Sequence, residues 1–398
     1  DLHIDALRLD AIHAMLDNSA MPFLQELAAV VEREAAHLNR RVYLIAESDL
    51  NDARVVRSSE SYGYGLDAQW NDDFQHALHV LLNGESHGYL ADFVDQSGAQ
   101  PLHFVTKALS EGYVYSGQYS PTRGRRHGNS SQEIPAHRFV VFLQNHDQVG
   151  NRLLGDRLTK SASLARVKLG VALLLLSPYV PLLFMGEEYG EDAPFLYFTS
   201  SSDPELVEMV REGRKREFSH DTSQGEPPDP FAEETFQRSK LNHALAQAGD
   251  HRRLRDFYRA LIALRRQLPA FELLSKDHTA VHAFEEEQVL LLQRWYGEDH
   301  AVALFNFSPN ECRMPLPIPA GVWRKLLCSS NEPTNEPTNE PTNEPTNEPM
   351  NEPMNEPTPF PEQLTSPGKL DLRLPGESFV LYRSETDIPA ERIVAPSR

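Results

Sequence analysis

Three acidic residues each end a short apolar run of the sequence. Asp10 lies in HIDALRLDAIHAM, Glu47 in RVYLIAESDLN and Asp147 in RFVVFLQNHDQVGNR. Each run is typical of a buried strand that is followed by a turn or a helix. In an α/β barrel, side chains at the carboxyl ends of such strands meet on one face of the molecule. Because two carboxylates in one cleft can act as acid and nucleophile on a sugar acetal, the pattern predicts glycosidic chemistry.

Each of these acids also has a purely structural interpretation. Arg8 lies two residues before Asp10 and therefore on the same strand face, where it keeps the carboxylate ionised and oriented. An ion pair with no catalytic role fits those two residues equally well. Glu47 follows the run YLIA, and a carboxyl group at the end of a buried strand is unfavourable unless it is paired or functional. Asp49 is the alternative acid at this strand end.

Histidines supply a second set of polar candidates. His146 and Asp147 end the run FVVFLQN, where both side chains can bond sugar hydroxyls, although a His–Asp pair is also a common tertiary contact. His76 and His79 share one face of an expected helix but have no evident third ligand, so we expect no metal site there. No G-x-S-x-G, G-x-G-x-x-G or Walker motif appears, which argues against serine hydrolysis and nucleotide binding.

Aromatic residues crowd the segments that follow the Glu47 run. Sugar rings stack on aromatic faces, and the same side chains can equally pack a small core of their own. The six residues are Tyr62, Tyr64, Trp70, Tyr113, Tyr115 and Tyr119.

Strands and helices are expected to alternate up to about residue 270, which predicts a parallel sheet. Residues 84–135 are rich in Gly, Tyr, Ser and Arg, and we expect them to form a long loop-bearing insertion. The expected strands are 3–9, 42–46, 66–70, 138–144 and 180–184, and the expected helices are 20–37, 72–83, 163–177 and 251–268.

From about residue 275 strands follow one another without helices, as in VLLLQRWY, HAVALFNFS and ESFVLYR. This pattern predicts a small antiparallel β domain over residues 275–398. Within it, residues 331–358 are seven tandem NEPT or NEPM tetrapeptides. Proline at every fourth position removes backbone donors, and no apolar face exists, so we expect a disordered surface loop without an assigned function.

The composition is that of a globular chain large enough for two domains, with 398 residues, 40% apolar and 24% charged. A net charge of -20 argues against nucleic-acid binding. Cys312 and Cys328 are too few for a disulfide framework, so we expect a reducing, cytoplasmic location. We expect no membrane span, because Pro178 and Pro181 interrupt the apolar run at residues 169–185.

Taken together, the three acidic motifs resemble the α-amylase superfamily of glycoside hydrolases. ALRLDAIHA is similar to its nucleophile motif, IAESD to its acid/base motif and FLQNHDQ to its third-acid motif, in the same order. Over roughly residues 1–270 the chain resembles more closely the malto-oligosyltrehalose trehalohydrolase family. RLDAIHAM, YGLDAQWNDDFQHALH, LLFMGEEYGEDAPFLYFTS and DPELVEMVREGRKREF carry this closer resemblance.

The resemblance implies the carboxy-terminal portion, about five strands, of a TIM (β/α)8 barrel over residues 1–274, followed by the β domain. It implies that Asp10 is the nucleophile, Glu47 the proton donor and Asp147 the stabiliser of the transition state. It implies neither a metal nor an organic cofactor. The implied substrate-binding residues are Arg8, His13, His146, Glu187 and Glu188.

The implied reaction is retaining hydrolysis of the α-1,4 bond next to a terminal trehalose unit. The substrate is then a malto-oligosaccharide-type chain, and malto-oligosyltrehalose synthase is the functional partner. A branching enzyme or an amylase would use the same acids, and a non-catalytic glucan-binding remnant is a further alternative.

One departure from the family concerns the amino-terminal β domain and the first three barrel strands, which do not precede the nucleophile strand here. The sequence begins at Asp1, without Met, already within a strand pattern. Five strands cannot close an eight-stranded barrel. We therefore expect this chain to be a fragment that is poorly stable or inactive alone.

Overall fold

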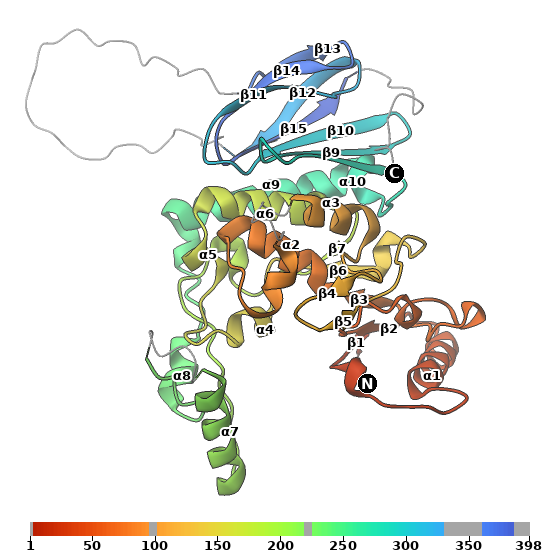
Figure 1. The fold of residues 1–398 in the computed structure, drawn as a ribbon, viewed down its shortest axis with the longest axis vertical. Coiled ribbons are helices and arrows are strands. Elements are labelled where there is room, and N and C mark those ends of the chain that lie inside the picture. Colours follow the sequence, from red (N-terminus) through yellow and green to blue (C-terminus); the bar gives the residue numbers. More distant parts are fainter. Residues whose placement is uncertain (1–2, 95–101, 219–224, 330–359, 386–398) are drawn as a thin grey trace, which may run out of the picture.

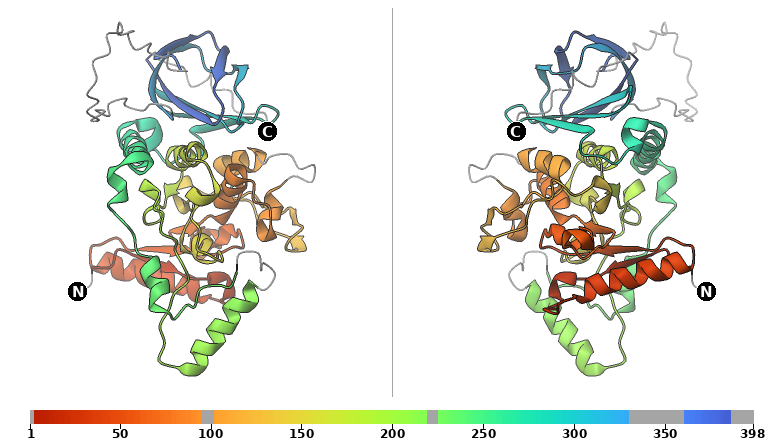
Figure 2. Two further views of the ribbon diagram at one scale, coloured as in Figure 1. Left: turned by 90° about the vertical axis from the view of Figure 1, so that its left-hand side faces the viewer. Right: turned by 90° about the vertical axis from the view of Figure 1, so that its right-hand side faces the viewer.

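The computed structural model describes residues 3–94, 102–218, 225–329 and 360–385. Strands and helices alternate in the first part of the chain, and only strands follow after about residue 272 (Figure 1). Two views from the sides show the β domain at one end of the molecule, separated from the parallel sheet by a layer of helices (Figure 2).

A five-stranded parallel sheet forms the centre of the first part. Its strands lie in the order β1-β2-β3-β6-β7, and each neighbouring pair is parallel. Because all strands run the same way, their carboxyl ends lie at one edge of the sheet, and the chain returns between them through crossover connections. The strands are β1 Ala6–Leu9, β2 Tyr43–Ala46, β3 Ala68–Trp70, β6 Phe139–Val141 and β7 Val180–Pro181.

Helix α2 (Asp72–Asn83) begins and ends at the residues that local sequence rules predict. The Asn71 side chain accepts a hydrogen bond from the Phe74 backbone N–H at 3.3 Å and caps the first turn. Gly84 adopts a left-handed conformation (φ 76°) and ends the helix. The other helices are α1 Phe23–His37, α3 Leu102–Glu111, α4 His146–Gly150, α5 Leu158–Ser161, α6 Leu164–Leu176, α7 Pro204–Glu217, α8 Glu233–Arg238, α9 Gly249–Gln267 and α10 Pro269–Glu272.

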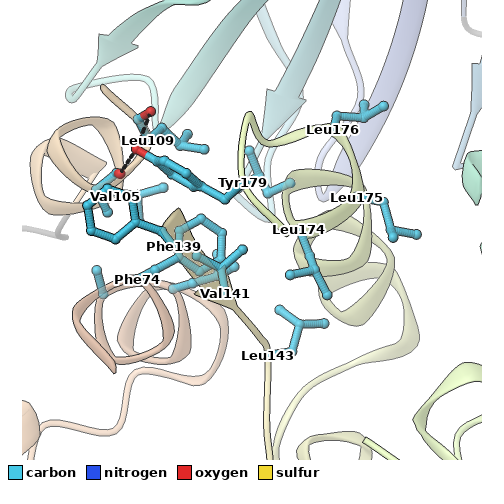
Figure 3. Close-up of a cluster of buried hydrophobic side chains, with 14 of the residues drawn as sticks. Phe74, Val105, Leu109, Phe139, Val141, Leu143, Leu174, Leu175, Leu176 and Tyr179 are labelled. Atoms are coloured by element: carbon cyan, nitrogen blue, oxygen red, sulfur yellow. Dashed lines mark hydrogen bonds between the residues drawn. The ribbon is translucent and has the colours of Figure 1, made fainter. Parts of the chain in front are cut away.

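Tyr179 joins the sheet to the helices that cover it (Figure 3). Its ring packs edge-on against Phe139 of β6, with centroids 5.5 Å apart, and against Phe74 of α2 at 6.4 Å. Its hydroxyl donates to the carbonyl oxygens of Ala108 and Leu109 in α3 at 2.7 and 2.9 Å. One buried side chain therefore fixes α2, α3 and β6 relative to one another.

The β domain contains a six-stranded antiparallel sheet in the order β13-β12-β15-β10-β9-β8 and a two-stranded sheet of β11 and β14. The fold class expected from the sequence, a parallel α/β part followed by an antiparallel domain, is thereby confirmed. The strands are β8 Thr279–Phe284, β9 Val289–Tyr296, β10 Asp299–Asn306, β11 Cys312–Leu316, β12 Gly321–Cys328, β13 Gln363–Ser366, β14 Leu370–Leu374 and β15 Ser378–Ser384.

Buried polar contacts join the β domain to the helices. The Arg294 guanidinium, on β9, donates to the carbonyl oxygens of Leu176 at 2.9 Å and Leu273 at 2.5 Å. Arg166, in α6, forms an ion pair with Glu377 at 2.6 Å. One continuous apolar core also runs through both parts, so they pack as one unit.

Two segments differ from their predicted structure. The insertion at residues 84–135 is more than loop, since it contains α3 and a hairpin of β4 (Tyr119–Ser120) and β5 (Arg125–Arg126). Helix α7 was not predicted; none of its residues is buried, and the Asp203 cap followed by Pro204 was the signal that marked its start. The tandem repeat at residues 331–358 lies outside the described residues. In the described ranges, no helix has both the length and the apolar character to cross a membrane.

Candidate active site

The three sequence-predicted acids come together at the carboxyl edge of the parallel sheet. Asp10 directly follows β1, and Glu47 directly follows β2. Asp147 lies in the first turn of α4, after β6. The Asn145 side chain caps this helix and accepts a hydrogen bond from the Asp147 backbone N–H at 2.8 Å. Residues separated by more than a hundred positions therefore share one site because their strands are parallel.

Arg8 is the centre of this cluster. Its guanidinium lies 2.6 Å from Asp10 Oδ1, 2.9 Å from Glu47 Oε2 and 3.9 Å from Asp147 Oδ2. It also stacks over the ring of Trp70, with the guanidinium carbon 4.4 Å from the ring centroid. Arg8 thus holds three carboxylates at once, and the aromatic face limits its own freedom to move.

Asp10 and Glu47 differ in environment, and this difference moves their pKa values in opposite directions. Burial raises the pKa of the Glu47 carboxyl above its ordinary value of 4.5, and a hydrogen bond shared with Asp10 raises it further. That same hydrogen bond, followed by the charge of Arg8, lowers the pKa of Asp10 below 3.8. The Glu47 side chain is 19% exposed and the Asp10 side chain 77%. Glu47 is therefore suited to hold a proton and Asp10 to stay ionised.

The Glu47 side chain is oriented by the turn after β1. Its Oε2 accepts a hydrogen bond from the Ala11 backbone N–H at 2.8 Å. Ala11 itself adopts a left-handed conformation (φ 44°, ψ 46°), which is strained for a residue with a Cβ atom. This strained turn therefore helps to position the proton-donor candidate.

The predicted histidines lie on either side of the acids. His146 Nε2 lies 3.5 Å from Asp147 Oδ1, and its ring contacts Trp70 edge-on at 6.0 Å. His13 Nδ1 lies 3.8 Å from Asp49 Oδ1. Asp49, the alternative acid at this strand end, is 46% exposed, so Glu47 has the environment better suited to a proton donor.

Glu187 and Glu188 are not brought to this cluster. Glu187 is buried beneath α9, where it accepts a hydrogen bond from the Tyr258 hydroxyl at 3.3 Å. Burial raises the pKa of Glu187 to about 8. Neither residue lines the cavity that contains the acids. Their position supports a structural role better than the substrate contact implied by the resemblance.

A cavity of about 500 Å³ adjoins the acids and extends toward α2. Sequence reasoning missed several of its residues, above all Asp72 at the first position of α2. The signal was available, because Asp72 follows the end of the third strand as the other acids follow theirs. The lining residues are Glu47, Asp49, Asp72, Gln75, His76, His79, Glu85, Tyr89, Leu90, Arg123, Asp147, Gln148, Asn151, Arg152 and Glu217.

The six aromatic candidates divide into packing and exposed groups. Tyr113 and Tyr115 are buried in the core, Tyr64 is partly buried against it, and Trp70 packs against Arg8. Tyr62 and Tyr119 are exposed and do not line the cavity. Tyr89, which the sequence did not single out, presents the aromatic ring that lines it.

The parallel sheet, its carboxylates at the strand ends and the antiparallel domain define part of an α-amylase-type barrel enzyme fold. A solved structure of a putative α-amylase from Salmonella typhimurium is similar to this chain, with a TM-score of 0.75 and 33% sequence identity. The similarity covers 96% of this chain and 57% of that protein. The expected partial barrel is thus confirmed.

Curated relatives of this chain share the name of one particular enzyme. Malto-oligosyltrehalose trehalohydrolase from Rhizobium sp. (strain M-11) is 44% identical over 79% of this chain and 52% of its own length. The protein of the same name from Arthrobacter ramosus is 45% identical over 71% of this chain and 49% of its length. The chain is therefore a relative of the malto-oligosyltrehalose trehalohydrolases, as its motifs predicted.

Two further findings describe the extent of this similarity. The chain spans about half the length of the curated relatives it matches. Residues 329–363 match a family model described as PT disordered repeat, which covers the tandem NEPT and NEPM tetrapeptides.

Proposed function

We propose that the whole protein hydrolyses the α-1,4 bond next to the terminal trehalose of maltooligosyl trehalose and releases trehalose. The observation that carries the proposal is the contact of Arg8 with both Asp10 and Glu47, whose pKa values move in opposite directions. Such a pair is what a retaining glycosidase requires. The names of the relatives supply the substrate class.

The proposed reaction has two displacements. Glu47 donates its proton to the glycosidic oxygen while the Asp10 carboxylate attacks the anomeric carbon, so the C–O bond breaks and trehalose leaves. Glu47, now ionised, then takes a proton from water as the water oxygen attacks the glycosyl–Asp10 ester. Asp10 is released as a carboxylate, and Glu47 regains its proton.

Arg8 and Asp147 support these steps through charge. Arg8 keeps Asp10 ionised and oriented toward the site of attack. The Asp147 Oδ2 atom lies 3.9 Å from the same guanidinium. Retaining enzymes separate their two carboxyl groups by about 5–5.5 Å. Because Asp10 and Glu47 share a hydrogen bond, that bond must open to admit the anomeric carbon between them.

The test compares products from maltotriosyl trehalose and from maltoheptaose. Release of free trehalose from the first substrate, with little action on the second, supports the proposal. Malto-oligosaccharides from maltoheptaose or newly branched glucans would instead favour an amylase or a branching enzyme. Asp10→Asn is expected to lower turnover at least about a thousandfold while substrate binding persists.

A non-catalytic glucan-binding protein would bind the substrate but form no product, with or without Asp10→Asn. If the protein does form product and Asp10→Asn leaves the rate unchanged, the assignment of Asp10 as nucleophile is wrong. As the functional partner we propose malto-oligosyltrehalose synthase, which forms the substrate. We also propose a cytoplasmic location, which the presence of only two cysteines in 398 residues supports.

A further inference from the structure

Glu187 is a buried carboxyl group that the proposed mechanism does not use. It is 3% exposed, and its Oε1 accepts a hydrogen bond from the Tyr258 hydroxyl of α9 at 3.3 Å. Its Oε2 is buried and has no hydrogen-bond partner among the described residues. Burial raises the pKa of this carboxyl to about 8. Because an incompletely bonded carboxyl group is unfavourable in a protein interior, packing alone does not explain its position.

The Glu187 carboxyl is also in contact with the Gln144 side chain. A hydrogen bond with Gln144 lowers the pKa of Glu187 and offsets part of the effect of burial. Gln144 is 5% exposed, and its Oε1 accepts a hydrogen bond from the Leu158 backbone N–H at 3.1 Å. Since the amide oxygen already serves Leu158, the amide nitrogen is the donor toward Glu187. Gln144 therefore joins Glu187 to the first residue of α5.

Arg157 holds the turn that carries Glu187. Its Nη1 donates to the Met185 carbonyl at 2.8 Å, and its Nε donates to the Ala193 carbonyl at 2.7 Å. Arg157 is 2% exposed and directly precedes Leu158. Glu187 and Leu158 are therefore fixed relative to each other. Because Gln144 bonds to both, its side chain has little freedom to move.

Gln144 directly precedes the residue that caps α4. The Asn145 side chain accepts hydrogen bonds from the backbone N–H groups of Asp147 at 2.8 Å and Gln148 at 3.4 Å. The Gln148 side chain accepts one from the Asn145 backbone N–H at 3.2 Å and completes a capping box. This box ties the orientation of Asp147 to the backbone of Asn145. A displacement of Gln144 is therefore passed on to the Asp147 carboxylate.

Side-chain contacts also hold the residue before Gln144. Residues 142–144 belong to neither β6 nor α4, so the regular hydrogen bonds of a strand or helix do not fix them. Gln75, which is 2% exposed, donates from Nε2 to the Leu143 carbonyl at 3.1 Å. Two buried amides thus set the path of the chain from the sheet to Asp147.

We infer that Glu187 is a positioning residue for Asp147 and that it acts through the Gln144 side chain. The inference rests on the proposed function, in which Asp147 stabilises the transition state. Glu187 does not line the cavity that contains Asp147, so its effect on the reaction passes through this series of contacts. Misplacing a catalytic group by about 1 Å costs on the order of a hundredfold in rate.

A double-mutant cycle on Glu187 and Gln144 tests the inference. Glu187→Leu removes the acceptor, Gln144→Met removes the amide, and the double variant removes both. We expect each single variant to lower kcat for trehalose release about tenfold or more and to change KM less than about threefold, because Asp147 acts in the transition state. The double variant should be no slower than the slower single variant, since both substitutions break the same connection. Glu187→Gln keeps an acceptor for Gln144 and should restore kcat to within about threefold of the unmodified chain.

Trp70 supplies a second readout that does not depend on turnover. Its ring contacts the His146 ring edge-on, with centroids 6.0 Å apart, and His146 directly precedes Asp147. In the 398-residue chain labelled with 5-fluorotryptophan, Trp70→Phe identifies the Trp70 resonance among those of three tryptophans by 19F NMR. We expect Glu187→Leu and Gln144→Met to shift this resonance. The resonances of the tryptophans in β9 and β12 should stay in place.

Tyr258→Phe is the matched control, because it removes the other hydrogen bond of Glu187 and leaves the contact with Gln144. We expect it to lower the melting temperature without changing kcat or the Trp70 resonance. The inference is overturned if Tyr258→Phe lowers kcat as much as Gln144→Met does, or if the two single effects add in the double variant. It is also overturned if Glu187→Leu leaves the Trp70 resonance in place.

Two further outcomes are decided in advance. If Glu187→Leu does not fold, Gln144→Met by itself must shift the Trp70 resonance, and an unshifted resonance overturns the inference. In a chain without turnover, the same resonance decides. Products other than trehalose, together with the expected cycle, contradict the proposed function alone. Trehalose release with additive effects of the two substitutions contradicts this inference alone.

Discussion

Arg8 contacts Asp10, Glu47 and Asp147 together, so the protonation of one acid depends on the others. The shared hydrogen bond from Glu47 to Asp10 shows this dependence, since it moves the two pKa values apart. At the scale of single residues, the site is therefore best tested by measuring activity and stability as a function of pH.

We expect a bell-shaped dependence of kcat on pH. The first step requires an ionised Asp10, whose pKa lies below 3.8, so activity falls only when the pH drops below that value. It also requires a protonated Glu47, whose pKa lies above 4.5, so activity falls as the pH rises through that raised pKa. Measured trehalose release between about pH 3 and pH 9 checks both flanks. Glu47→Gln should abolish the alkaline flank; a flank that persists in this variant assigns it to another group.

Asp72→Asn is expected to stabilise the chain more at high pH than at low pH. Burial, and then the charge of Asp73, raise the pKa of Asp72 to about 7 from its ordinary 3.8. Between these values the folded chain holds a proton that the unfolded chain releases, so Asp72 lowers stability as pH rises through this window. Asn does not titrate, so the variant should gain about 1 to 2 kcal/mol at about pH 8, after allowance for partial exposure, and little at about pH 4.

Thermal unfolding of both proteins at the two pH values measures this difference. Asp73, whose pKa is raised to about 6, is present in both proteins, and the measured difference includes the loss of its repulsion with Asp72. An equal change in melting temperature at both pH values would contradict the raised pKa of Asp72.

At the scale of elements, one side chain outside α3 forms hydrogen bonds with the end of that helix. The Tyr179 hydroxyl bonds the carbonyl oxygens of Ala108 and Leu109 near the end of α3 (Figure 3). Carbonyls in the last turn of a helix lack the full set of intrahelical donors, and here Ala108 also accepts from the Gly112 backbone N–H at 3.1 Å. Tyr179 therefore acts as the cap of a helix from a distant part of the sequence.

Tyr179→Phe is expected to destabilise the chain by about 1 to 3 kcal/mol, because the Leu109 carbonyl loses the hydroxyl donor, whereas the Ala108 carbonyl keeps its hydrogen bond from the Gly112 backbone N–H. The ring itself is kept, so packing against Phe139 is unchanged. Denaturant unfolding measures the effect. Tyr62→Phe is the matched control, since Tyr62 is 92% exposed, and we expect no change there. Equal stability of the two variants would show that the hydroxyl contacts contribute nothing.

At the scale of the whole molecule, the two parts depend on each other through Arg294. This side chain is 1% exposed and donates to the carbonyls of Leu176 and Leu273, which belong to the helical part. We expect Arg294→Met to lower the free energy of unfolding by about 2 to 4 kcal/mol, because two carbonyls lose their donors. Calorimetry is the measurement. Arg313→Met, at an exposed ion pair with Asp371, should change little; two variants of equal stability would argue against the role of Arg294.

The parallel sheet is open in the described part of the chain. Strand β1 pairs only with β2, and the Asp10 side chain beside it is 77% exposed. Water around a nucleophile weakens the electrostatic interactions on which the chemistry depends. That the chain is poorly stable or inactive alone stays a prediction. A kcat/KM at least about a hundredfold below that of a full-length relative, measured side by side, would support it; equal rates would refute it.

The sequence by itself determined most strands and helices of the parallel part and the places of the three acids after their strands. Strand-end motifs mark Asp10, Glu47 and Asp147 because apolar runs and their caps are local features. The same rules predicted α2, whereas α7 was missed because none of its residues is buried, although Asp203 and Pro204 mark its start.

Only the tertiary structure decided which of the other candidates join the acids. It places Arg8 among three carboxylates, whereas it buries Glu187 beneath Tyr258, away from them. The sequence motifs marked both residues as substrate-binding candidates and did not distinguish these two positions. The tertiary structure also shows that the buried Gln75 Oε1 receives no hydrogen bond from the residues that the structure describes. Burial, pKa and the partner of a polar group are set by contacts across the fold, and spacing along the chain does not encode them.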